Sequence, residues 1–142
     1  MTQPPVPQGN YVAARRHGDL VYTSGMTPRD NGVLMFKGTV EASTPVEAYQ
    51  AAVDLATKNS LTAARLLLAS HERVVGILSL TVYIAAEKEF AAHARLADFA
   101  SAYLQREIGD EGIGCRAAIG VATLPGNAPV EIQLVAIIAN RA

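Results

Sequence analysis

Cysteine is almost absent from this 142-residue sequence, and tryptophan is absent altogether. The single thiol, Cys115, excludes a disulfide within the chain and is typical of a protein kept in a reducing compartment. Zinc sites need several ligands at defined spacing, and the three histidines, His17, His71 and His93, share no such spacing. We therefore expect no metal site.

Neither sign of charge is in excess, because 12 Lys and Arg residues face 13 Asp and Glu residues. Nucleic acids and anionic membranes attract clustered cations, and the only dense basic stretch is ARRH at 14–17. The longest apolar run, VVGILSLTVYIAA at 74–86, is too short to cross a bilayer. The first ten residues lack the basic and apolar regions of a signal peptide. We expect a cytoplasmic protein with no nucleic-acid or membrane partner.

Half of the residues are hydrophobic, which suffices for one packed domain over 1–142. The patterns predict a hairpin over 11–25, strands over 33–36, 74–86, 115–124 and 130–139, and helices over 44–70 and 87–107. TPVE at 44–47 offers a capping box for the first helix. The order β-β-β-α-β-α-β-β predicts an α+β fold with a mixed six-stranded sheet and two helices on one face. Self-association would cover the other face.

Two charged residues, Arg116 and Glu131, lie in the most apolar part of the chain. They are either strand-end charges facing solvent, a salt bridge, or parts of a site for an anionic ligand. Residues 125–129 are too few for a parallel crossover, so the strands on either side should run antiparallel. Arg116 then lies roughly 25 Å along the sheet from Glu131 at ~3.3 Å per residue. If both serve one site, the glutamate must come from a neighbouring subunit.

Several longer stretches carry a family resemblance. GNYVAARRHGDLVYTSGMTPRDNG, FKGTVEASTPVEAYQAA, VYIAAEKEFAAHARLADFASAYL and CRAAIGVATLPGNAPVEIQLVAII resemble the RidA/YjgF family of reactive-intermediate imine deaminases, also labelled the endoribonuclease L-PSP family. The resemblance extends over about 9–139. It implies a chorismate-mutase-like fold and a homotrimer with ligand clefts between subunits. It also implies hydrolysis of enamine or imine acids such as 2-aminoacrylate to 2-oxo acids and ammonia, without a cofactor.

The resemblance also assigns roles to individual residues. It makes Arg116 the arginine that binds the substrate carboxylate, which a planar guanidinium can grip through two parallel hydrogen bonds. Glu131 becomes the general acid/base that activates water. The remaining substrate-binding positions implied are Tyr11 at the cleft mouth, Ser24 and Gly25 at a strand end, and the backbone of Ala118.

The sequence departs from the family pattern at several of these places. Met26 stands where a glutamine usually follows Thr-Ser-Gly, and Ala117 and Ala118 stand where Ser-Cys usually follows the arginine. The asparagine expected in the second helix is not evident. These departures indicate a divergent subgroup. Two functions stay open: an imine deaminase acting on small carboxylate-bearing metabolites, or a trimeric protein that binds such a metabolite without turning it over.

Overall fold

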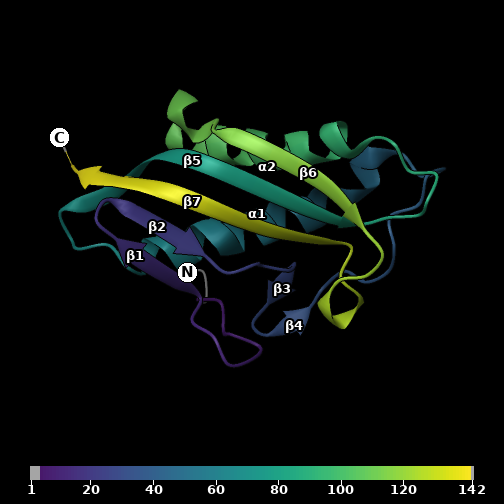
Figure 1. Ribbon diagram of the computed structural model, residues 1–142, viewed down its shortest axis with the longest axis horizontal. Coiled ribbons are helices and arrows are strands. Elements are labelled where there is room, and N and C mark those ends of the chain that lie inside the picture. The colour runs from purple at the N-terminus through teal and green to yellow at the C-terminus, as the bar shows by residue number, and fades with distance from the viewer. Residues whose placement is uncertain (1–3, 142) are drawn as a thin grey trace.

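A five-stranded sheet forms the centre of the structure, a computed structural model that describes residues 4–141 (Figure 1). Its strand order is β1-β2-β7-β5-β6, and every neighbouring pair is antiparallel except β5 with β6. The strands are β1 (Ala14–His17), β2 (Leu20–Thr23), β5 (Glu72–Ala85), β6 (Cys115–Val121) and β7 (Val130–Asn140). The α+β class predicted from the sequence is confirmed.

The sheet has one strand fewer than the six predicted, because residues 33–34 pair locally. They form β4 (Val33–Leu34), which pairs only with β3 (Arg29–Asp30) in a separate two-stranded ribbon. Asn31 and Gly32 connect them with φ angles of 56° and 82°, the positive values that a two-residue hairpin turn requires. This tight turn folds β4 directly back onto β3 and away from the main sheet.

Both helices, α1 (Gln50–Arg65) and α2 (His93–Ile108), lie on one face of the sheet, as predicted (Figure 1). The first packs over β2 and β7, and the second over β5 and β6. Alternate strand residues face these helices because side chains of a strand point to opposite sides in turn. The core between the layers is built from fully buried aliphatic side chains, among them Leu61, Val82, Ile84, Leu96, Leu104, Ile132 and Leu134.

Both helices are shorter than predicted. The expected capping box of Thr44 does not form: a 3₁₀ turn over Val46–Tyr49 precedes α1, and no side chain caps either element. The second helix begins at His93, six residues later than predicted, and Glu87 bonds to a neighbouring loop instead. There Glu87 donates its N–H to Val40 O at 2.9 Å and accepts the Ala42 N–H at 2.6 Å on its carboxylate.

Among residues 4–141, no helix covers the opposite face of the sheet. The β-strand register places Tyr22, Val135, Ser79 and Cys115 side by side across four strands on this face. Tyr22 is 51% exposed and Leu78 is 47% exposed. The self-association expected from the sequence therefore has an apolar surface available to it, and it stays a prediction.

Candidate functional site

Glu131, the second residue of β7, lies directly against Gly25 just beyond the end of β2. A Cβ placed on Gly25 would be 2.6 Å from the Glu131 carboxyl carbon and closer still to Oε2, so only glycine leaves room for this side chain. Met26 and Ile132 hold the two segments together through reciprocal N–H to C=O bonds of 2.7 and 2.8 Å. Burial raises the pKa of the Glu131 carboxyl above its ordinary value. A carboxyl whose pKa is raised keeps its proton to a higher pH than an exposed carboxyl does, which suits a group that exchanges protons with a ligand.

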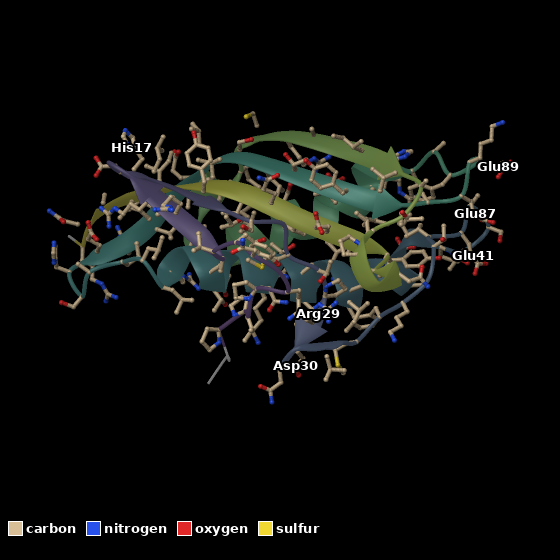
Figure 2. All side chains as sticks on the ribbon, turned by 60° about the horizontal axis from the view of Figure 1, so that its bottom comes forward. His17, Arg29, Asp30, Glu41, Glu87 and Glu89 are labelled. Atoms are coloured by element: carbon tan, nitrogen blue, oxygen red, sulfur yellow. The ribbon has the colours of Figure 1, made fainter. Side chains whose placement is uncertain are left out.

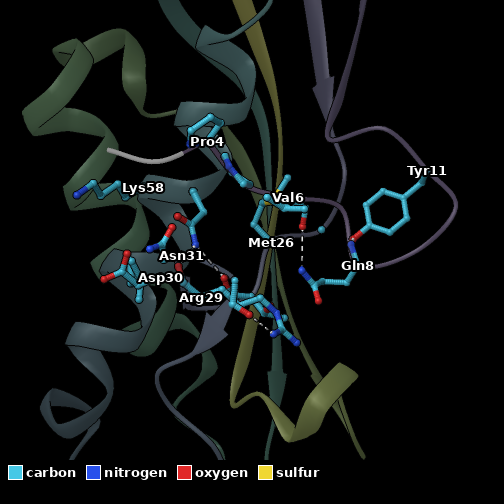
Figure 3. A pocket seen from close by; sticks show the side chains of 15 residues that line it. Pro4, Val6, Gln8, Tyr11, Met26, Arg29, Asp30, Asn31 and Lys58 are labelled. Atoms are coloured by element: carbon cyan, nitrogen blue, oxygen red, sulfur yellow. Dashed lines mark hydrogen bonds between the residues drawn. The ribbon is translucent and has the colours of Figure 1, made fainter. Parts of the chain in front are cut away.

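Tyr11 and Gly25 line one cavity of about 370 Å³ (Figure 3). The Tyr11 side chain is 46% exposed, and its hydroxyl accepts the N–H of Gln8 at 3.0 Å. Ser24 precedes Gly25 and donates its hydroxyl to Val12 O at 2.7 Å, which fixes the strand end. Met26, the departure from the family pattern, is buried and lines the same cavity. Ser24, Gly25 and Glu131 are therefore grouped at one place, which we call the Glu131 half-site. Tyr11 shares with it only the cavity beside Gly25, whose lining includes neither Ser24 nor Glu131.

Arg116 lies elsewhere, on the edge strand β6, and extends over α2. Its Nη1 donates to Asp98 Oδ1 at 2.8 Å and to Ser101 Oγ at 3.1 Å, and its Nη2 donates to Ala94 O at 3.2 Å. A guanidinium has five N–H donors, so these three bonds leave two for a ligand. We call Arg116 with the adjoining α2 residues the Arg116 half-site. Sequence reasoning missed Asp98 and Ser101, although Ala94, Asp98 and Ser101 share one stripe of α2 by helical spacing.

The two half-sites face opposite sides of the sheet. On the shared neighbour β5, Arg116 is in register with the buried Leu80, whereas Glu131 is in register with Tyr83. Leu80 and Tyr83 are three residues apart, an odd number, so they point to opposite faces of the sheet. Side chains alternate along a strand, so Arg116 points toward the helices and Glu131 toward the uncovered face. The two residues do not meet within one chain, as predicted.

The predicted separation of roughly 25 Å along the sheet is wrong, because the last two strands are not neighbours. They run antiparallel, as expected, but β5 lies between them. Their registers on β5 differ by three residues, or ~10 Å along the strand. Residues 124–127 form a turn: the Asn127 N–H bonds to Leu124 O at 3.0 Å, and Gly126 has φ 67° and ψ 11°, which suit the third position of a type II turn.

Ala118, the last of the predicted site residues, lies two residues beyond Arg116 on β6 and is in register with Val82. Because β6 is the outermost strand, half of its backbone N–H and C=O groups point away from the sheet. Ala118 thus belongs with Arg116, and the uncovered strand edge is where backbone groups could meet a ligand.

Acidic side chains gather at one end of the molecule, where Figure 2 shows Glu41, Glu87 and Glu89 together, far from His17. Glu41 lies in the segment before α1, and Glu87 and Glu89 lie in the segment before α2. No group of three or more His, Cys, Asp or Glu side chains within residues 4–141 is placed to hold a metal ion. In the same part of the chain, every helix is too short or too polar to cross a membrane.

The fold defines the class: a mixed sheet with two helices on one face is the chorismate-mutase-like α+β architecture of the solved L-PSP proteins. The sequence profile described as Endoribonuclease L-PSP matches residues 1–138. The chain therefore belongs to the endoribonuclease L-PSP family, the family also called RidA/YjgF.

Individual relatives agree with this assignment. A crystal structure of an Agrobacterium tumefaciens protein of unknown function is 32% identical, covers 96% of this chain and 86% of its own, and gives a TM-score of 0.82. A candidate endoribonuclease from Shewanella oneidensis is 26% identical, with coverages of 95% and 89% and a TM-score of 0.86. Protein TCP17 of Trypanosoma cruzi is 29% identical over 89% of this chain and 80% of its own length. Escherichia coli TdcF, solved with bound serine, shares the fold at 20% identity, with coverages of 98% and 94% and a TM-score of 0.61.

Proposed function

We propose that the chain forms a homotrimer in the cytoplasm and hydrolyses small enamine or imine acids of the 2-aminoacrylate type to 2-oxo acids and ammonia. The environment of the Glu131 carboxyl is the observation that best supports this proposal. The carboxyl is half-buried on Gly25, its pKa is raised by burial, and no hydrogen bond holds it among residues 4–141. A carboxyl without a structural partner is free to exchange protons with water and substrate.

Trimer formation would bring the two half-sites together. Within one chain they face opposite sides of the sheet, so a complete site needs Arg116 from one subunit and Glu131 from another. The uncovered sheet face, with Tyr22 and Leu78 exposed, is the surface on which such an assembly would form. The lone thiol, Cys115, is consistent with a reducing compartment.

The proposed hydrolysis requires mainly that the protein position the substrate and the attacking water. The two remaining N–H donors of Arg116 would bind the substrate carboxylate. Glu131 as the carboxylate would take one proton from water while the water oxygen bonds to the imine carbon, and would pass it to the imine nitrogen, which gives a carbinolamine. It would then take the proton of the new hydroxyl group and pass it to the same nitrogen as the carbon–nitrogen bond breaks, so that the 2-oxo acid and ammonia leave. Holding water and an already electrophilic imine carbon together supplies most of the acceleration.

The test follows 2-oxo acid release from 2-aminoacrylate generated in situ and compares it with the uncatalysed rate. We expect acceleration by the wild type and a loss of about 10²-fold or more in Glu131→Gln, the usual range for removing a general acid/base. Arg116→Lys keeps the charge but loses the paired hydrogen bonds, so its KM should rise. Arg65→Ala is the matched control, since it removes an exposed arginine paired with Glu107 at 3.3 Å.

Other outcomes would replace the proposal. If the wild type gives no acceleration but 2-oxo acids raise its melting temperature, and Arg116→Ala abolishes that shift, the protein binds such metabolites without turnover. RNA cleavage that survives purification and disappears in Glu131→Gln would instead indicate the nuclease activity in the family's name.

A further inference from the structure

We propose that the cavity lined by Met26 is a second ligand site, and that it binds a small zwitterion of the α-amino acid type with an apolar side chain. The site is separate from the Glu131 half-site. The inference does not depend on the proposed hydrolysis, because it concerns residues to which that reaction assigns no role.

This cavity, of about 370 Å³, lies on the helix side of the strand end that carries Gly25 (Figure 3). Met26 pairs with Ile132, which is fully buried beneath the helices, whereas Glu131, the residue before Ile132, points toward the uncovered face. Successive side chains of an extended chain point to opposite sides, so the Met26 cavity and the Glu131 carboxyl are separated by the backbone of the strand. The volume is near the lower end of the ~300–1,000 Å³ that is usual for ligand pockets, so the cavity suits a small molecule.

Three segments enclose the cavity. The helix α1 contributes Leu55, Lys58 and Asn59, which share one face because positions three and four apart on a helix are neighbours. The β3–β4 ribbon contributes residues 29–32, and the chain before β1 contributes residues 4–6 and 8. Parts of the chain far apart in sequence thus meet around one space.

Asn59 presents an unused acceptor to this space. The residue is only 7% exposed, and its Nδ2 donates to Thr27 O at 3.1 Å and to Arg29 O at 2.8 Å. These two carbonyls fix the orientation of the amide, since only the NH₂ group can face them. The Oδ1 atom accepts no hydrogen bond among residues 4–141 and is still open to solvent. A ligand N–H would supply the partner that a buried acceptor normally has.

Two unpaired charges lie at the same cavity. Figure 3 shows Lys58 and Asp30 on one side of it, and within residues 4–141 neither side chain forms a hydrogen bond or an ion pair. The other cation of the lining, Arg29, already donates from Nη1 to Gly32 O at 3.1 Å. An α-amino acid carries both complementary charges: its ammonium group suits Asp30 and the Asn59 oxygen, and its carboxylate suits Lys58.

The rest of the lining is largely apolar. Met26 is buried, and Leu55 and Val6 contribute aliphatic surface from the helix and from the chain before β1. An apolar ligand side chain would leave water by packing against these residues, whereas a charged one would lose its hydration there. The lining therefore favours amino acids with aliphatic or aromatic side chains.

Calorimetric titration with L-alanine, L-valine, L-leucine and L-phenylalanine tests the site and requires no turnover. We expect binding, and L-leucine to bind more tightly than L-alanine because it buries more apolar surface. Two analogues of L-leucine separate its charges: 4-methylpentanoate lacks the ammonium group, and 3-methylbutylamine lacks the carboxylate. Each should bind about tenfold more weakly than L-leucine, because each loses one charged hydrogen-bonding group.

Substitutions of the two charged residues should show a crossed pattern with these ligands. Lys58→Gln should weaken L-leucine and 4-methylpentanoate about tenfold and leave 3-methylbutylamine within about twofold. Asp30→Asn should weaken L-leucine and 3-methylbutylamine and spare the acid. Leu55→Trp fills the cavity and should abolish binding while the circular dichroism spectrum stays unchanged. Lys88→Gln is the matched control, since it removes an exposed lysine in the segment before α2 and should change no affinity.

Several outcomes would overturn the inference. It is wrong if none of the four amino acids binds, or if Lys58→Gln and Asp30→Asn both leave the affinity for L-leucine unchanged. It is also wrong if Glu131→Gln or Arg116→Ala abolishes L-leucine binding while Leu55→Trp keeps it, because the amino acid would then occupy the proposed catalytic site. The hydrolysis itself is judged separately, by release of 2-oxo acid from 2-aminoacrylate.

Discussion

The contact between Gly25 and Glu131 leads to a sharp prediction for Gly25→Ala. The added methyl group would lie 2.6 Å from the Glu131 carboxyl carbon, whereas ordinary carbon contacts begin near 3.4 Å. Because backbone hydrogen bonds between Met26 and Ile132 hold both segments, the side chain of Glu131 must move rather than the strands. The carboxyl group would shift by about 1 Å.

A displacement of that size in a catalytic group costs on the order of 10²-fold in rate. We therefore expect kcat/KM for 2-aminoacrylate hydrolysis to fall about 10²-fold in Gly25→Ala, or about 2.7 kcal/mol in transition-state stabilisation. Folding should be affected less, because the half-buried Glu131 side chain can turn toward solvent. Thermal unfolding monitored by circular dichroism measures this second effect.

A double-mutant cycle separates the mechanism from general damage. If the methyl group acts only by displacing the carboxyl, then Gly25→Ala should have almost no further effect in a Glu131→Gln background that has already lost the acid. Ser24→Ala is the neighbouring control, since it removes only a hydroxyl bonded to Val12 O. Full additivity of the two substitutions, or full activity of Gly25→Ala alone, would refute this reasoning.

Three further predictions concern stability and assembly. Because burial raises the pKa of Glu131, the folded state loses stability as pH rises above 4.5, so Glu131→Gln should be more stable than wild type at pH 7 but not at pH 4 in urea unfolding. Glu72 accepts two bonds from Arg16, at 2.6 and 2.7 Å, which lower its pKa to about 2. The stability that this pair contributes is present above about pH 4.5 and lost between there and pH 2, and Glu72→Gln should remove that dependence in the same assay. Leu78→Asp puts a charge on the uncovered sheet face, so light scattering should report monomers while circular dichroism stays unchanged; trimers that persist would move the subunit interface elsewhere.

Local patterns were sufficient for most of the secondary structure. The hairpin of β1 and β2, the long buried β5 and the turn at Gly126 depend on residue types a few positions apart, which the sequence displays directly. The helix starts were predicted less well. Glu87, which was expected to begin the second helix, pairs instead with Val40 and Ala42, which are more than forty residues away in the chain. A capping signal at Thr44 could not reveal that the backbone there would take another path.

The family and the α+β class were available from the sequence, because they depend on motifs and on the order of elements. The prediction that Arg116 and Glu131 do not meet within one chain rested on a wrong separation along the sheet, whereas the structure places them on opposite faces. Only the tertiary structure decided which residues share a place. It placed β5 between the last two strands and Glu131 against Gly25. It also placed His93 against Gly120, and Arg116 where it bonds to Ala94 O, the carbonyl of the residue after His93. Strand pairing partners and register arise from packing across the whole core, and a one-residue shift moves a side chain to the other face of the sheet. No local pattern in the chain carries that information.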